Sequence, residues 1–285
     1  MFKALIFKKV INSIKPKITI TVILGIISIA TIVSAMITEP YSIEQATTGN
    51  SIKVLSYNIQ QGINDKANKD FDGQLAVIMQ ADPDIIGLQE SDTCRISSGN
   101  SDVVRFMNSK LKKYSYFGPK TVTGTFGLTL LSKYPIENAM TFYMYSEGGE
   151  QTATIEAQIT VGTTTFNIFV THLGNYVNTS VSRAQIIQQE NILSRIEGKN
   201  NVILMGDFNF IPNTEQYNIT TAVLDDCWEV ATTTEIEDLP TDWVTRIPNE
   251  RIDHMFVSSG TTISKCQYFG GTNSDHPALM TVIQL

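Results

Sequence analysis

Short apolar runs that end in polar residues recur along this chain and predict buried β-strands. The clearest run is 202–205, which is followed by Gly206, Asp207, Phe208 and Asn209. Apolar residues without polar alternation are typical of a strand covered on both faces. Asp207 and Asn209 are two residues apart, so on an extended chain their side chains point to the same side. The pattern predicts a core strand whose exit carries a carboxylate and an amide, although Gly, Asp and Asn are also ordinary turn residues.

The remaining patterns alternate in part between strands and helices. Predicted strands cover 52–59, 84–90, 114–117, 126–132, 152–161, 164–172, 251–258, 264–269 and 278–284. Predicted helices cover 72–80, 102–113 and 180–196, where apolar residues recur at helical spacing. The Thr-rich stretch 213–249 predicts loops with a short helix. Gly162 and Thr163 indicate a hairpin, and such hairpins favour a layered α/β sandwich over a doubly wound parallel sheet.

Polar or titratable side chains stand at six of the predicted strand ends. These residues are Asn58, Glu90, His172, Asp207 with Asn209, Asp253, and Asp275 with His276. Each has an ordinary explanation by itself, as a turn residue, a cap or a core histidine. The chain has three histidines, however, and all three fall in these segments. We therefore interpret the six strand ends as parts of one site.

The residue types in this set suit the hydrolysis of phosphate esters. Asn, Asp and Glu oxygens are hard ligands that suit Mg²⁺, Mn²⁺ or Ca²⁺. A histidine beside such an ion can transfer a proton or stabilise a phosphoryl oxygen at neutral pH. Together these groups predict in-line attack of water on a phosphoester, assisted by a divalent metal.

The amino-terminal part of the chain has the pattern of a membrane anchor. Residues 18–38 carry no charge, and five lysines and no acidic residue precede them. As a helix these residues would extend roughly 31 Å, about one bilayer core. We expect a basic cytoplasmic segment at 1–17, a transmembrane signal anchor at 18–38, a linker at 39–50 and an extracellular or lumenal catalytic domain at 51–285. Alternatively, Val33, Ser34 and Ala35 form a cleavage site, which would make the protein secreted.

The charge of the chain from Glu39 onward argues against nucleic acid as a partner that is bound by bulk electrostatics. It has 16 basic and 28 acidic side chains, so a nucleic-acid substrate would need a local basic patch or bridging metal ions. Arg105, Lys110, Lys112 and Lys113 belong to one predicted helix, which we interpret as a solvated face. The three cysteines match no metal-site spacing and are expected to be ordinary, partly buried residues, although one pair could be oxidised outside the cytosol.

The order of these motifs resembles the endonuclease/exonuclease/phosphatase superfamily. The matching segments are SYNI at 56–59, LQE at 88–90, THL at 171–173, GDFN at 206–209, RID at 251–253 and SDHP at 274–277. The resemblance covers essentially all of 52–285. It implies a four-layered α/β sandwich, with two packed mixed sheets flanked by helices, here preceded by one hydrophobic helix.

The resemblance also implies a role for each residue of the site. Glu90 would be the principal metal ligand, helped by Asn58, and Asp275 would bind or support the metal, which we expect to be Mg²⁺ or else Mn²⁺ or Ca²⁺. The reacting groups would be five others: His172, Asp207, Asn209, Asp253 and His276.

Within that group of five, Asp207 would orient or deprotonate the attacking water, and Asn209 would hold phosphate or metal. Asp253 would pair with His276, a general base or phosphate ligand, while His172 would stabilise charge on the phosphoryl group. Which of Asp207 and His276 takes the proton stays open.

A narrower resemblance concerns the segments at 56–62, 87–92, 116–127 and 169–174. They are similar to the C-terminal domain of eukaryotic proteins that remodel the lipid of glycosylphosphatidylinositol anchors. Lys120 and the glycine-rich 123–127 would then form a substrate-side loop, or else an ordinary hairpin turn. His254 departs from the superfamily pattern, and we expect it behind the catalytic residues or at the surface.

Three functions follow from these patterns. The first is a membrane-anchored, metal-dependent phosphoesterase that hydrolyses a phosphodiester or phosphomonoester, with a lipid headgroup or related substrate. The second is an extracellular nuclease of the same superfamily. The third is a non-catalytic binding module, which would have lost acids or histidines of the site.

Overall fold

The computed structural model describes residues 18–33, 49–96, 99–120, 124–146, 151–175 and 181–285. The chain divides into two compact units, 1–42 and 43–285. The described part of the first unit is a helix at 18–33 whose side chains are exposed. Among the described residues, no helix is long and apolar enough to cross a membrane. The rest of the predicted anchor, 34–38, the segment 1–17 and most of the linker lie outside the described residues.

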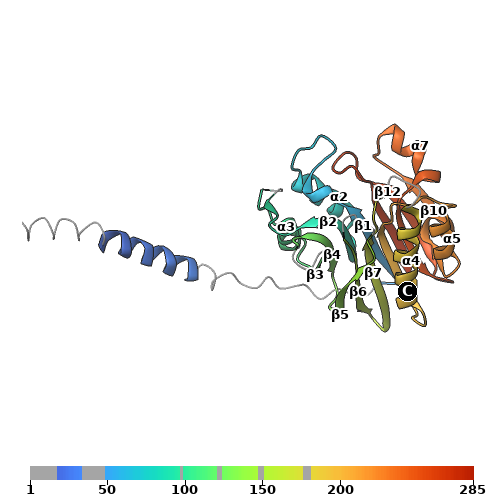
Figure 1. Ribbon diagram of the computed structural model, residues 1–285, viewed down its shortest axis with the longest axis horizontal. Helices are drawn as coiled ribbons and strands as arrows, with labels where there is room; N and C mark the ends of the chain where they lie inside the picture. The colour runs from blue at the N-terminus through green and yellow to red at the C-terminus, as the bar shows by residue number, and fades with distance from the viewer. Residues whose placement is uncertain (1–17, 34–48, 97–98, 121–123, 147–150, 176–180) are drawn as a thin grey trace, which may run out of the picture. The chain divides into compact units, whose positions relative to one another are not determined.

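Two β-sheets form the frame of the second unit (Figure 1). The first has seven strands in the order β10-β12-β13-β1-β2-β4-β3. Its strands are β1 (Ser51–Asn58), β2 (Ile85–Asp92), β3 (Tyr114–Pro119), β4 (Phe126–Ser132), β10 (Thr233–Ile236), β12 (Ile263–Phe269) and β13 (Ala278–Gln284). The second has six strands in the order β5-β6-β7-β8-β11-β9. They are β5 (Ile136–Met144), β6 (Thr152–Val161), β7 (Thr164–His172), β8 (Val202–Asp207), β9 (Leu224–Asp226) and β11 (Asp253–Ser258).

Both sheets are mixed. The pairs β1/β2 and β10/β12 in the first sheet and β7/β8 in the second are parallel, and the other pairs are antiparallel. Alternation along β1 explains how the layers form: Ile52 and Val54 join the core that contains both sheets, whereas Leu55 and Tyr57 belong to the core that α2 and α3 cover. The second sheet packs Phe169 and other residues against α4.

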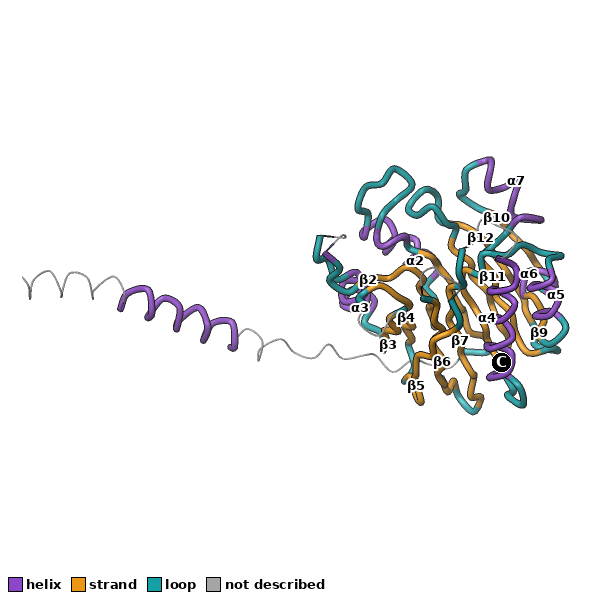
Figure 2. Tube along the Cα trace, viewed as in Figure 1, coloured by secondary structure: helices purple, strands orange, loops and turns teal. Residues whose placement is uncertain are grey.

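Helices cover the outer faces of the two sheets (Figure 2). On the seven-stranded sheet they are α2 (Phe71–Ala81) and α3 (Val103–Leu111), and on the six-stranded sheet α4 (Val181–Ile196) and α5 (Glu215–Thr221). The short helices α6 (Cys227–Val230) and α7 (Thr241–Glu250) instead add side chains to the core that contains both sheets, and a 3-10 turn η1 (Gln60–Gly62) follows β1. The order of layers is helix, sheet, sheet, helix. The predicted four-layered α/β sandwich is therefore confirmed.

Two stretches differ from the sequence prediction. The region 213–249 holds α5, β9, α6, β10 and most of α7, each only 3 to 10 residues long, too short for a periodic pattern to be visible. Strand β5 was not predicted, because it is an edge strand with many exposed positions and a register shift between Glu137 and Met140. The shift interrupts the two-residue alternation by which strands are recognised.

Two further side-chain predictions need correction. Lys113 does not lie on a solvated helix face: it follows α3 and is buried, with Nζ donating to the carbonyl oxygen of Pro83 at 2.7 Å. The cysteines are free thiols, and they differ in exposure, since Cys227 and Cys266 are fully buried and Cys94 is exposed.

Gly206 sets the spacing between β7 and β8 beside the reactive strand ends. A Cβ atom at this position would lie 2.0 Å from the carbonyl oxygen of Thr171, its register partner on β7. Any side chain would therefore push apart the two strands that carry His172 and Asp207.

We expect Gly206→Ala to lower the free energy of unfolding by about 3 kcal/mol, the upper end for overpacking a core. Urea denaturation measures the change. Gly260→Ala is the matched control: Gly260 has a φ of +84°, but a Cβ atom there would meet none of the described residues within 4 Å, so only the backbone cost of about 1 kcal/mol applies. Equal losses in the two variants would contradict this account of the β7–β8 contact.

Candidate active site

Three neighbouring strands of the six-stranded sheet bring reactive side chains to one edge. In the parallel pair β7/β8, His172 is the register partner of Asp207, and in the antiparallel pair β8/β11, Asp207 is the partner of Asp253. The seven-stranded sheet contributes Asn58 from the end of β1, and Asn58 Nδ2 donates to Asp207 Oδ2 at 3.0 Å. This hydrogen bond joins the ends of the two sheets.

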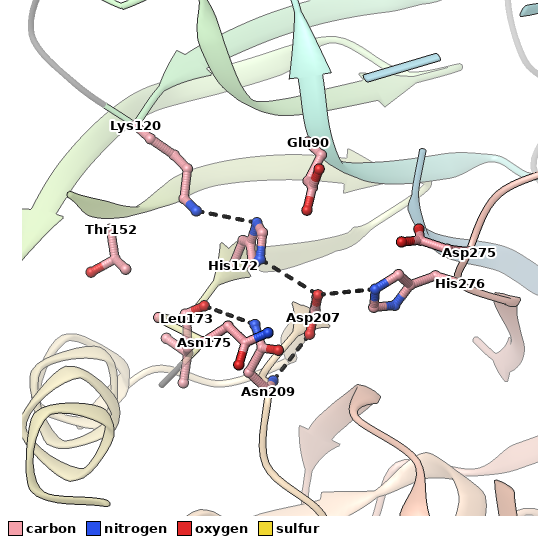
Figure 3. Close-up of a pocket in the computed structure, with 11 residues that line it drawn as sticks. Glu90, Lys120, Thr152, His172, Leu173, Asn175, Asp207, Asn209, Asp275 and His276 are labelled. Carbon is pink, nitrogen blue, oxygen red and sulfur yellow. Dashed lines mark hydrogen bonds and ion pairs between the residues drawn. The ribbon is translucent and has the colours of Figure 1, made fainter. Parts of the chain in front are cut away.

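A pocket of about 280 Å³ opens at this edge (Figure 3). It is lined by Glu90, Lys120, Thr152, His172, Leu173, Gly174, Asn175, Asp207, Asn209, Asp275 and His276. Two predicted site residues are outside the lining, but both contact residues of the pocket: Asn58 bonds to Asp207, and Asp253 Oδ2 lies 2.9 Å from His276 Nδ1. The structure therefore gathers the sequence-predicted site residues in one place, Lys120 included.

Asp207 is the centre of the polar contacts. Its Oδ1 accepts from the backbone N–H of Asn209 at 3.0 Å, and its Oδ2 lies 3.5 Å from His172 Nε2 and 3.6 Å from His276 Nε2. Burial raises the pKa of Asp207 to about 7; His276 opposes the rise and Asp253 adds to it. A carboxylate with a pKa near neutrality can take a proton from water and release it again.

The two histidines of the pocket have partners of opposite charge. His276 faces Asp253, and although burial alone would lower its pKa, Asp253 and Asp207 raise it to about 10. His172 Nδ1 lies 3.2 Å from Nζ of Lys120. Burial and the Lys120 ammonium hold the pKa of His172 well below its ordinary value. At neutral pH, before any metal or substrate binds, these surroundings favour the cationic form of His276 and the neutral form of His172.

Glu90 enters the pocket from an irregular point of β2. The pairing of β2 with β4 shifts register between Leu88 and Ser91, and Glu90 has a φ of +51°. Such a bulge redirects a side chain, and a left-handed non-glycine residue stores strain that is typical of functional positions. Burial raises the pKa of Glu90, the hydrogen bond from Asn58 opposes this, and Asp275 adds to the rise.

The donor atoms fit a divalent cation. Figure 3 shows the carboxylates of Glu90 and Asp275 facing the same part of the pocket. Asp207, Asp253 and His276 also offer ligand atoms within 4.8 Å of one another. Asp253 Oδ1 is buried and has no hydrogen-bond partner among the described residues. Oxygen-rich, acidic surroundings of this kind suit Mg²⁺, Mn²⁺ or Ca²⁺. Asn58 Nδ2 donates to the carboxylates of Glu90 and Asp207, while Asn58 Oδ1 accepts from the N–H of Gln60.

Several groups that line or support the pocket were missed by the sequence analysis. Thr152, Gly174 and Asn175 line it. Gln185 donates to the carbonyl oxygens of Gly174 and Asn209. Gln74 donates to the carbonyl oxygens of Ile59 and Asn273, which belong to the two segments that carry Asn58 and Asp275. Gln185 and Gln74 are buried on helices. A glutamine on the buried face of a helix is the one signal that could have indicated such a supporting role.

His254 is fully buried, so the surface alternative for this residue is wrong. Its ring stacks on Phe210 and Phe256, and Nε2 lies 3.0 Å from the carbonyl oxygen of Phe210. The other ring nitrogen, Nδ1, lies 3.7 Å from Oδ2 of Asp226. Asp226 also accepts hydrogen bonds from Arg251 and Tyr217. His254 lies behind the pocket, in the packing that supports β8 and β11.

With two packed mixed sheets and a polar pocket at their shared end, the chain has the fold of endonuclease/exonuclease/phosphatase proteins, as comparison with solved structures shows. A superfamily structure from Beutenbergia cavernae matches with a TM-score of 0.68 and 19% identity, over 83% of this chain and 72% of that one. A mannosyl-6-phosphatase of Bacteroides thetaiotaomicron matches with a TM-score of 0.65 and 17% identity, over 82% of this chain and 100% of that one. At these identities the likeness concerns the fold alone.

Sequence comparison gives a narrower assignment. Residues 50–243 match the family described as the PGAP2IP C-terminal nuclease-like domain, and the chain belongs to this family. Protein cwh43 of Schizosaccharomyces pombe is 33% identical over 110 residues, which are 39% of this chain and 11% of that protein. The match thus spans about a tenth of the relative's length.

The strain at Glu90 predicts an unusual order of stabilities. Because a left-handed conformation costs an L-residue with a Cβ about 1 kcal/mol more than glycine, we expect Glu90→Gly to be more stable than Glu90→Ala by that amount in urea denaturation without metal. At Gln89, which is not among the left-handed residues, the order should reverse, since glycine weakens a strand. The same order at both positions would contradict strain at Glu90.

The raised pKa of Asp207 predicts a pH-dependent stability. In the unfolded chain an aspartate titrates near pH 4, so between about pH 4 and the folded value of about 7 the folded state binds more protons, and stability falls as the pH rises. Asp207→Asn removes this pH-dependent loss of stability, because asparagine does not titrate. In EDTA, we expect the variant to gain at least about 1 kcal/mol relative to the parent between pH 4.5 and 7.5. A difference that does not change with pH would contradict the assignment.

Proposed function

We propose that this protein is a divalent-metal-dependent phosphoesterase that acts on a lipid-linked phosphoester. The observation that carries the proposal is the surroundings of Asp207: a buried carboxylate that accepts from Asn58 and lies between the Nε2 atoms of two histidines. A phosphoester hydrolase needs a proton acceptor for water next to donors for the phosphoryl oxygens. The pocket provides both within one polar cavity.

In this proposal Asp207 orients the attacking water and accepts its proton. The hydrogen bonds from Asn58 and from the Asn209 N–H hold the carboxylate in place. His276, oriented by Asp253, donates a charged hydrogen bond to a phosphoryl oxygen. The opposite assignment, with His276 as the base, requires it first to lose a proton that its two acidic neighbours hold tightly. We therefore favour Asp207 as the base.

The opposite wall of the pocket would bind the transferred phosphoryl group. His172 donates from Nε2 as a neutral ring, and Asn209 contributes its side-chain amide, which is fixed by a hydrogen bond to the carbonyl oxygen of Leu173 at 3.0 Å. Fixed donors of this kind stabilise charge that develops in the transition state without reorganising at the moment of reaction.

Glu90 and Asp275 would hold the metal, with Asn58 beside them. When bound, a divalent ion would neutralise phosphate charge and polarise the phosphoryl oxygen. It would also compensate the repulsion between Glu90 and Asp275, whose proximity raises the pKa of Glu90.

Two observations support a lipid-linked substrate at a membrane surface. The family assignment and the local identity to Protein cwh43 agree with the resemblance to proteins that remodel glycosylphosphatidylinositol lipid. The uncharged stretch 18–38, preceded by five lysines, would hold the domain at a bilayer in the secretory pathway. The excess of acidic over basic side chains in the rest of the chain disfavours a long nucleic-acid substrate.

A metal and variant screen with the full-length chain tests this function. We expect EDTA to abolish hydrolysis of bis(p-nitrophenyl) phosphate and Mg²⁺ or Mn²⁺ to restore it. Glu90→Gln and Asp207→Asn should each lower kcat/KM at least about 100-fold. Glu156→Gln is the matched control, because Glu156 pairs with Arg195 on the α4 side of the sheet. Full activity of Glu90→Gln, or activity in EDTA, would overturn the proposal.

The substrate class is tested by a parallel panel. Phosphatidylinositol vesicles, free inositol phosphates and short DNA are offered at equal phosphoester concentration. A preference for the vesicles supports the lipid-linked assignment. Retained cleavage of DNA at moderate salt would instead identify a nuclease.

A further inference from the structure

The contact between Lys120 and His172 bears on which ring nitrogen of His172 carries a proton. Nζ of Lys120 lies 3.2 Å from Nδ1 of His172, on the side of the ring away from Asp207. Lys120 is 2% exposed and His172 is 6% exposed. Both partners are thus withdrawn from bulk water, which makes a directed hydrogen bond between them stronger than it would be at the surface.

We propose that Lys120 is a positioning residue for His172: its ammonium group donates to Nδ1, so that the single ring proton resides on Nε2 and points at Asp207 and the pocket. A lysine ammonium has three donors and no acceptor. A neutral imidazole has one donor nitrogen and one acceptor nitrogen. When Nδ1 is committed as the acceptor, Nε2 must carry the proton.

Both the backbone and the side chain of Lys120 contact Phe126 at the start of β4. Lys120 follows β3 directly, and its backbone N–H donates to the carbonyl oxygen of Phe126 at 2.9 Å. Its Nζ lies 5.4 Å from the centroid of the Phe126 ring, within the range of a cation–π contact. Strands β3 and β4 also lie close together here. Gly127, which follows Phe126, is the register partner of Pro119, and a Cβ atom on Gly127 would lie 2.3 Å from the carbonyl oxygen of Gly118. The close strands and the aromatic ring hold the ammonium against the histidine.

The second pocket histidine has the opposite arrangement. Asp253 Oδ2 lies 2.9 Å from Nδ1 of His276, so that this nitrogen donates and the carboxylate stabilises a fully protonated ring. Lys120 excludes that state for His172. The Nε2 atoms of the two rings lie at similar distances from Asp207 Oδ2. Lys120 thus makes His172 a neutral donor, and Asp253 makes His276 a cationic donor.

The catalytic consequence rests on the proposed function. A neutral Nε2–H can donate to a phosphoryl oxygen or to Asp207 without delivering a full proton to the base. A ring protonated on Nδ1 alone would present a lone pair to the phosphoryl oxygen, and this would matter most in the transition state, where negative charge develops on that oxygen. Losing the Lys120 donor should therefore affect turnover more than substrate binding.

Histidine NMR tests the proton position without any substrate. The chain has three histidines, so ¹⁵N-labelled histidine gives few signals, and the spectrum of His172→Gln assigns those of His172. In the full chain at pH 7.5, with and without Mg²⁺, we expect a protonated Nε2 and an unprotonated Nδ1. Lys120→Met should lose this pattern, whereas Lys120→Arg and Lys120→Gln, which keep a donor, should retain it. The buried His254 reports in each variant whether the fold is intact.

A second buried lysine provides the matched control. Lys113 donates to the carbonyl oxygen of Pro83, outside the pocket, and Lys113→Met should leave the His172 signals unchanged. A proton on Nδ1 in the parent, an unaltered His172 in Lys120→Met, or an equal change in Lys113→Met would each overturn the proposal.

Kinetics with bis(p-nitrophenyl) phosphate complete the test. We expect Lys120→Met to lower kcat about 10- to 100-fold, the usual effect of losing a group that orients a functional histidine, with KM changed less than about twofold. A rise in KM with kcat and the His172 signals unchanged would make Lys120 a substrate ligand and overturn its positioning role. If the parent hydrolyses no phosphoester, the proposed function fails, while the NMR measurement still decides the role of Lys120.

Discussion

The hydrogen bond between Asn58 and Asp207 is the contact on which the site depends. It joins the end of β1 in one sheet to the end of β8 in the other, and both residues are almost completely buried. A buried carboxylate is expensive unless its oxygens find donors. The Asn58 amide and the Asn209 N–H supply those donors. The bond from Asn58, which helps to make the buried acid tolerable, also holds the ends of the two sheets together. The packing of the sandwich and the preparation of the site are therefore one constraint.

Burial then gives the neighbouring groups their different properties. In a cavity from which most water is excluded, burial and the charged neighbours together decide the state of an ionisable side chain. Asp253 favours the charged form of His276, Lys120 favours the neutral form of His172, and the pKa of Asp207 between them rises toward neutrality. One polar pocket therefore contains an acid and a base at the same pH, which is the general arrangement by which hydrolases divide these roles.

The sequence predicted most of the fold because the core strands are regular. The apolar run at 202–205 and the alternation along β1 were sufficient to place strands, and the polar residues at their ends indicated a shared site. Prediction failed where regularity fails. Strand β5 is interrupted by a register shift, the elements of 213–249 are short, and Lys113 is buried by a contact with a loop that is distant in sequence. The periodic pattern of apolar residues predicts only regular helices and strands with one buried face, and it gives no information on contacts between distant segments.

By itself the sequence determined which chemical groups are available and that they stand at strand ends, because alternation and apolar runs are local properties of the chain. Only the tertiary structure decided what each group faces. The bulge at Glu90, the pairing of His172 with Asp207, the cation behind His172 and the burial of His254 all arise from contacts between segments far apart in sequence. Sheet register and desolvation act through space, and they turn a set of polar residues into a site with defined proton positions.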